Sequence, residues 1–155
     1  MRARYSRLAL LPAAALLAAC ASTSRTETVS PGEVATSVGV VRMTATLNPE
    51  NQTTVMGEVV VEPTIDPRRM QVRITLHGAP PSINLPWSIH RGTCETDLGV
   101  YGSAASYPMV GTSSDGRAQL QTVLSIQPPT GGSHVVRVFA GPGSDDVVAC
   151  GDLRQ

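Results

Sequence analysis

The chain has 155 residues, with twelve Lys plus Arg, twelve Asp plus Glu and a formal net charge of zero. All of its cations are Arg and they are scattered along the chain, which excludes the concentrated basic surface on which nucleic-acid binding depends. Aromatic residues make up only 3%, whereas Val, Ala, Thr and Gly are abundant. This composition indicates a β-rich core built from aliphatic side chains.

The N-terminus has the parts of an export signal. Arg2, Arg4 and Arg7 give it positive charge, and a short apolar run of Leu and Ala follows over residues 8–19. Because this run is too short to span a bilayer as a helix, we predict a cleaved signal peptide over residues 1–19.

The end of that run, Leu17-Ala18-Ala19-Cys20, resembles a bacterial lipobox, in which small residues precede a Cys that is lipidated on its thiol. We expect cleavage before Cys20 and acyl chains such as palmitate on its sulfur, each buried CH₂ contributing about 0.8 kcal/mol to anchoring. The protein would then be lipid-anchored to a membrane of the bacterial cell envelope, facing the periplasm or the exterior. Ala21, rather than Asp, at the next position points to the outer membrane if two membranes are present. The alternative is an ordinary secretory signal with a chance Cys.

Residues 20–36 are polar, contain Pro and Gly and show no periodicity, so we predict a flexible tether. The remainder, 37–155, is predicted to be one β-sandwich domain. Within it, residues 70–77 alternate most clearly between apolar and polar side chains. No segment has helical spacing, residues 95–114 are loop-like, and the whole pattern is typical of an antiparallel β-sandwich or barrel. In chain order the predicted strands are 38–47, 53–62, 70–77, 87–90, 118–126, 134–140 and 147–150.

Two cysteines remain after Cys20 is assigned to lipid. Cys94 and Cys150 form an even pair in an exported chain, which predicts a disulfide. A bridge between them would close a long loop and contribute about 4 kcal/mol to stability on the chain-entropy model. The alternative is two free thiols, one of them functional.

Three short motifs resemble those of the copper/zinc superoxide dismutase family. They are Trp87-Ser88-Ile89-His90 with Gly92 and Cys94 after it, the turn Asp115-Gly116-Arg117-Ala118, and the terminal Ala149-Cys150-Gly151. The order and coarse spacing hold over roughly residues 38–153. The resemblance implies an eight-stranded Greek-key barrel, a copper/zinc superoxide dismutase-like fold, and a disulfide between Cys94 and Cys150.

The family's metal chemistry does not carry over to this sequence. Ser88 stands where the first copper-binding His is expected, so only His90 of the His-x-His pair remains. The segment 95–114, where the zinc ligands are expected, contains no His. The strand that holds the last copper His reads Val135-Val136-Arg137-Val138, and Val147 occupies the place of the catalytic Arg. Copper redox sites need several converging imidazoles and zinc needs four ligands, so we expect no dismutase activity and no cofactor.

The three histidines are the remaining candidates for chemistry. We expect His90 to be a packed, hydrogen-bonded residue, His77 to lie at a strand end, and His134 to open a strand. Trp87 is predicted to be part of the core. A nucleophilic site has no motif support, because no Gly-x-Ser-x-Gly is present.

We therefore expect a non-enzymatic, lipid-anchored envelope protein with a dismutase-like barrel that has lost its metal sites. It would act as a structural or binding module through surface loops such as 95–114, with a protein partner that the sequence does not identify. The alternative is an envelope copper- or zinc-binding protein that uses His90 together with His77 or His134.

Overall fold

The computed structural model describes residues 41–155, and the predictions for the signal peptide, Cys20 and the tether lie outside these residues. The described part consists of antiparallel strands and one short 3₁₀ turn, which confirms the all-β class. Within it, no helix has the length and apolar character needed to cross a membrane. The elements are β1 (Met43–Pro49), β2 (Met56–Pro63), β3 (Met70–His77), β4 (Asn84–Leu85), β5 (Trp87–Gly92), β6 (Asp97–Val100), η1 (Ala104–Ser106), β7 (Val110–Gly111), β8 (Ala118–Leu124), β9 (His134–Phe139) and β10 (Val147–Asp152).

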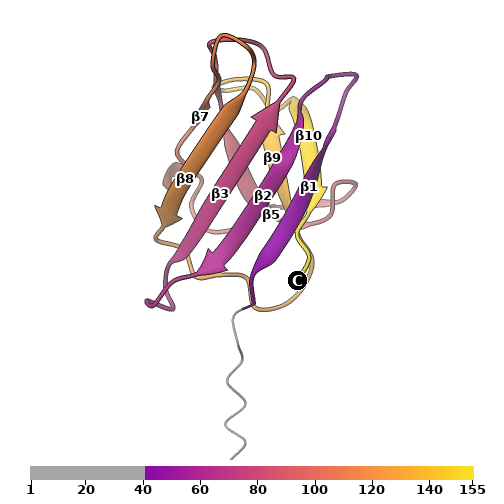
Figure 1. Cartoon of the computed structure of the whole chain (residues 1–155). Coiled ribbons are helices and arrows are strands. Elements are labelled where there is room, and N and C mark those ends of the chain that lie inside the picture. Colours follow the sequence, from indigo (N-terminus) through magenta and orange to yellow (C-terminus); the bar gives the residue numbers. More distant parts are fainter. Residues whose placement is uncertain (1–40) are drawn as a thin grey trace, which may run out of the picture. The chain divides into compact units, whose positions relative to one another are not determined.

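Eight strands form one curled antiparallel sheet in the order β6-β5-β9-β10-β1-β2-β3-β8. Strands β1, β2, β3 and β8 form the near layer in Figure 1, with β5, β9 and β10 behind them. The chain makes two hairpins through β1, β2 and β3 and then crosses to β5 on the other side, returning from β6 to β8. These crossovers give the Greek-key arrangement. A separate pair of short strands, β4 and β7, links the connection between β3 and β5 to the connection between β6 and β8.

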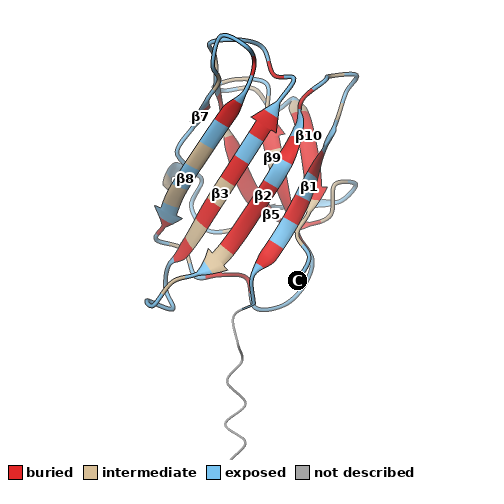
Figure 2. Ribbon diagram, in the orientation of Figure 1, coloured by how far each residue is buried: buried red, intermediate tan, exposed pale blue. Residues whose placement is uncertain are grey.

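The core lies between the two layers and is built almost entirely from aliphatic side chains. Buried and exposed residues alternate along β1 and β3 (Figure 2), as expected for strands with one face in the core. Trp87 is only 2% exposed and packs edge-on against Tyr107, so its predicted core position is confirmed. Its indole Nε1–H donates a hydrogen bond to the Pro108 carbonyl, which satisfies the one polar group it buries.

The structure corrects the prediction that residues 95–114 are a loop. This segment contains β6, η1 and β7, and it places Tyr107 and Val110 in the core. The elements are too short to show a period in the sequence, and β7 pairs with β4, which is not its neighbour along the chain. The bounds of the first strand also differ from the predicted 38–47. β1 begins at Met43 and runs to Pro49, because Asn48 and Pro49 pair with β10.

A disulfide joins Cys94 to Cys150, with 5.8 Å between their Cα atoms and a separation of 56 positions along the chain. The predicted bridge is therefore present, and the free-thiol alternative is wrong. It ties the β5–β6 turn to β10, which lies in the middle of the sheet order.

Candidate functional site

Ser88, His90 and Arg137 gather on the outer face of β5 and β9. Because side chains alternate along a strand, Trp87 and Ile89 enter the core while Ser88 and His90 lie on the other face. Register places Ser88 directly opposite Arg137 on β9. Ser88, where the family resemblance led us to expect a copper-binding His, thus lies opposite an Arg.

A β-bulge brings a carboxylate to His90. In the β5–β6 pair, His90 aligns with Val100 but Gly92 aligns with Asp97, so β6 carries one extra residue. Gly99 adopts a positive φ of 94° within this bulge, and its N–H donates to Asp97 Oδ1 at 2.8 Å. The bulge holds the Asp97 carboxylate against the imidazole.

Both ring nitrogens of His90 have a partner. Nδ1 lies 2.8 Å from Asp97 Oδ1, and Nε2 lies 2.8 Å from Ser88 Oγ. In the neutral tautomer that suits these partners, Nδ1–H donates to the carboxylate and the Ser88 hydroxyl donates to Nε2. In this polar cluster, His90 is 5% exposed and Ser88 6%, so both are buried, whereas Asp97 lies at the surface.

Arg137 completes the cluster. Its Nη1 lies 3.6 Å from Asp97 Oδ2, and its Nη2 donates to the Cys94 carbonyl at 2.9 Å. The Arg137 Nε is buried without a hydrogen-bond partner. The guanidinium therefore links the polar cluster to the disulfide-bonded turn.

The pKa of Asp97 lies below its ordinary value. Partial burial by itself would raise this pKa, but the Gly99 N–H, the His90 ring and the Arg137 charge all stabilise the carboxylate and lower it. Asp97 is therefore ionised at neutral pH and neutralises Arg137.

The Ser88–His90–Asp97 order is that of a hydrolytic triad, but its setting differs from that of an active site. Ser88 is almost fully buried, and the five hollows of about 400–650 Å³ found along the described chain are lined by other residues. A nucleophile needs space for its substrate and donors for the developing oxyanion. This cluster is suited to holding β5, β6 and β9 together.

The same residues do not fit copper or zinc. Binding a cation at His90 would require breaking a hydrogen bond at one ring nitrogen and placing the ion near the Arg137 charge. The other two histidines are elsewhere: His134 aligns with Arg91 and so lies on the opposite face from His90, while His77 ends β3 and pairs with Met56. Within residues 41–155, the three histidines form no ligand cluster.

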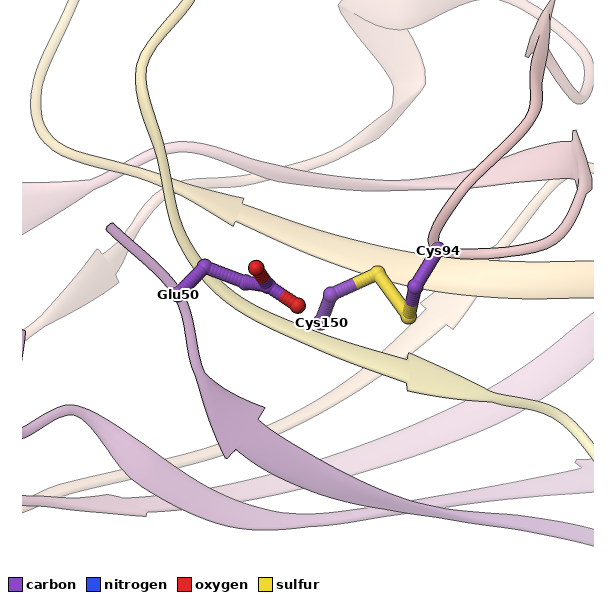
Figure 3. Close-up of side chains that lie close together, drawn as sticks. All are labelled: Glu50, Cys94 and Cys150. Carbon is purple, nitrogen blue, oxygen red and sulfur yellow. A yellow bond between two sulfur atoms is a disulfide. The ribbon is translucent and has the colours of Figure 1, made fainter. Parts of the chain in front are cut away.

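One group of possible ligand atoms does come together, at Glu50, Cys94 and Cys150 (Figure 3). The Glu50 carboxylate lies beside the disulfide in a hollow of about 540 Å³ that Thr46, Asp152 and Arg154 also line. The thiolate is the form of Cys that binds metals, and both sulfurs here are bonded to each other. In the oxidised protein this group therefore has one free ligand, the Glu50 carboxylate, and is not a metal site.

A more open hollow of about 530 Å³ lies at the mouth of the sandwich between the β5–β6 turn and the start of β9; we call it the Arg91 groove. Arg91 lies 5.2 Å from the centre of the Tyr101 ring, and Tyr101 packs edge-on against His134 at 4.9 Å. Thr93 and Thr96 add hydroxyls, and no acidic side chain lines the groove. Among the described residues, no carboxylate lies within 4.0 Å of Arg91, so its charge is available to a ligand.

The pKa of His134 in this groove is lowered. Desolvation is the main cause and the Arg91 charge adds to it, while the Gly132 carbonyl acts in the opposite direction. His134 is thus neutral at pH 7, and Arg91 supplies the positive charge of the groove.

Sequence analysis identified His90, His134 and the disulfide but not their surroundings. It gave Asp97 no role, and Arg91 and Tyr101 were not singled out. The bulge glycine at position 99 was a local signal that could have placed Asp97 near β5. Neither the comparison with protein-family models nor the comparison with curated proteins gives a match to this chain.

Proposed function

We propose that this protein is a lipid-anchored binding module of the bacterial cell envelope, without enzymatic activity, on a dismutase-like scaffold that no longer holds metals. The observation that carries the proposal is the bonding of His90. Both of its ring nitrogens are engaged by Ser88 and Asp97, and Arg137 takes the opposing strand position. A metal site has been replaced by a neutralised polar cluster that stabilises the sheet.

The Arg91 groove is the best-suited ligand surface of such a module. It combines an unpaired guanidinium, hydroxyl groups and the Tyr101 ring, with the exposed Leu98 at its edge. Such a lining suits a small ligand that carries an anionic group and an apolar part. It also uses residues 96–101, within the segment in which the sequence predicted the binding loops.

Metal content tests the loss of metal sites. The full chain, exported from bacteria and offered copper and zinc in turn, is expected to retain neither after dialysis and to show no dismutase activity. A His90→Gln variant serves as the control and is expected to give the same result. Stoichiometric metal in the wild type that disappears in the variant would contradict the proposal.

The lipid anchor has a separate test. The intact mass of the exported protein is expected to correspond to a chain beginning at Cys20 plus acyl groups, and the protein is expected in the membrane fraction. A Cys20→Ala variant is expected to lack the acyl mass. An unmodified Cys20 in the wild type would overturn this part of the proposal.

A further inference from the structure

Strand register places several turns at the end of the sandwich where the N-terminal segment joins. β1 begins at this end, and Met43 pairs with Val61 near the end of β2. The β2–β3 turn over residues 64–69 and the β8–β9 connection over 125–133 lie at the same end (Figure 1), because Pro63 pairs with Met70 and Met70 pairs with Leu124. The β5–β6 turn over residues 93–96 also lies at this end, because the Gly92 N–H donates to the Ser133 carbonyl of the β8–β9 connection. Arg154 bridges to Thr44 there as well.

This end has a different charge from the opposite one. Its turns and strand ends carry five Arg and five carboxylates, and the β8–β9 connection is uncharged: Arg42, Arg68, Arg69, Arg91 and Arg154 against Glu62, Asp66, Glu95, Asp97 and Asp152. The turns at the opposite end carry four carboxylates and one Arg: Glu50, Asp115, Asp145 and Asp146 against Arg117. The domain is therefore electrically polarised along its strands, and its less negative end is the one at which β1 begins.

The β2–β3 turn also presents an apolar side chain. Ile65 is fully exposed at its tip, and the partly exposed Val123 lines the adjoining hollow with Pro63 and Arg69. No carboxylate of residues 41–155 lies within 4.0 Å of the guanidinium of Arg68 or Arg69. An exposed Ile flanked by two unpaired Arg has the chemistry of a site that enters a lipid interface and contacts phosphate groups.

We infer that this end of the sandwich, centred on Ile65, Arg68 and Arg69, docks on the anionic phospholipid surface to which the protein is anchored. The inference rests on the lipid anchor of the proposed function. The predicted tether of about 20 residues has a root-mean-square span of about 25 Å, which keeps the domain near the bilayer. At this short range, negative lipid headgroups attract Arg68 and Arg69 and repel the acidic turns of the opposite end.

Hydrogen exchange of the full lipidated protein on vesicles tests this orientation. Vesicles of phosphatidylcholine with an equal part of phosphatidylglycerol are compared with vesicles of phosphatidylcholine alone. Amides of residues 64–69 are expected to exchange roughly fivefold more slowly on the anionic vesicles, and this protection is expected to fall in high salt. Amides of the opposite turn, residues 112–117, serve as the internal control and are expected to exchange equally on both.

A triple variant, Ile65→Ser with Arg68→Ser and Arg69→Ser, is expected to stay on both vesicles through its acyl chains and to lose the protection. Because these side chains are exposed, we expect the variant to unfold at the same temperature as the wild type. Arg117→Ser, at the opposite end, is the matched control and is expected to keep the protection.

The possible failures are distinguishable. Equal exchange of residues 64–69 on the two vesicle types, with the protein still bound to both, would overturn the docking face alone. Protection that survives in the triple variant would also overturn it. A wild-type protein that sediments with neither vesicle would overturn the lipid anchor, and the docking face with it.

Discussion

At the residue scale, His90 is fixed in place by hydrogen bonds at both of its ring nitrogens. Its ring is held by Asp97 on one side and Ser88 on the other, and Asp97 is shared with Arg137. His90 and Ser88 are buried and the Arg137 side chain is mostly buried, so these three depend on one another and on Asp97 for their polar contacts. Removing one of these side chains is therefore expected to lower the free energy of unfolding by more than the contribution of its own hydrogen bond.

Asp97→Asn tests this dependence. The amide cannot neutralise Arg137, whose side chain is mostly buried, so we expect the free energy of unfolding to fall by about 1–2 kcal/mol. This range is below that of a fully buried ion pair because the Asp97 side chain is 37% exposed. Urea unfolding measures the change, and Glu95→Gln, an exposed neighbour, is the control that should leave stability unaltered. An unchanged urea midpoint in Asp97→Asn would contradict the role of the carboxylate.

His134 makes stability depend on pH. Because its pKa in the folded protein is lowered by burial, protonation favours the unfolded chain. The contribution is fully present above the unfolded pKa of about 6.5 and is lost as pH falls through the lower folded value. We expect the unfolding temperature to decrease between pH 7.5 and pH 5.5, and His134→Gln to reduce this decrease. The exposed His77→Gln is the control, and an equal pH dependence in all three proteins would exclude His134 as its source.

At the scale of the elements, β10 joins the two layers because it pairs with β9 on one side and β1 on the other. Its contact with β1 is short, with Asn48 opposite Cys150 and Pro49 opposite Ala149. Gly151 allows the strands to approach closely here, since a Cβ at this position would lie 2.3 Å from the Thr46 carbonyl oxygen. The junction of the layers therefore requires glycine.

Gly151→Ala is expected to force β10 away from β1 and to lower the free energy of unfolding by about 1–3 kcal/mol. Gly131→Ala is the matched control, because a Cβ there would meet no atom within 4 Å and its backbone does not have a positive φ. We expect thermal unfolding of the control to match the wild type. Equal stability of the two variants would show that the sheet adjusts without cost.

At the scale of the whole molecule, the disulfide and the charge distribution have different roles. The disulfide ties a turn to the middle of the sheet, whereas the charges distinguish one end of the sandwich from the other. The first stabilises the domain in an oxidising compartment, and the second supports the orientation proposed at the membrane.

Removal of the disulfide is expected to be the most destabilising change. Cys94→Ala with Cys150→Ala releases a loop spanning 56 residues and should lower the free energy of unfolding by about 4 kcal/mol. Thermal unfolding with and without reductant measures this effect. Reductant is expected to destabilise the wild type and to leave the double variant unaffected. A wild type that is insensitive to complete reduction would contradict the prediction.

Much of the fold could be predicted from local patterns. The alternation of residues 70–77 gave the bounds of β3, and the apolar face of Trp87 and Ile89 placed both in the core. These predictions succeed because the side-chain period of a strand is a local property that depends on which face is buried. Residues 97–100 and 110–111 were missed because such short strands have no measurable period.

The sequence by itself determined the antiparallel β class, the pairing of Cys94 with Cys150 and the absence of the expected histidines, since each depends on residue identity or local spacing. Only the tertiary structure decided that Asp97 reaches His90, that Arg137 faces Ser88 and that Arg91 meets Tyr101 and His134. Those contacts arise from strand register and one bulge, and a shift of a single residue would turn each side chain to the other face of the sheet.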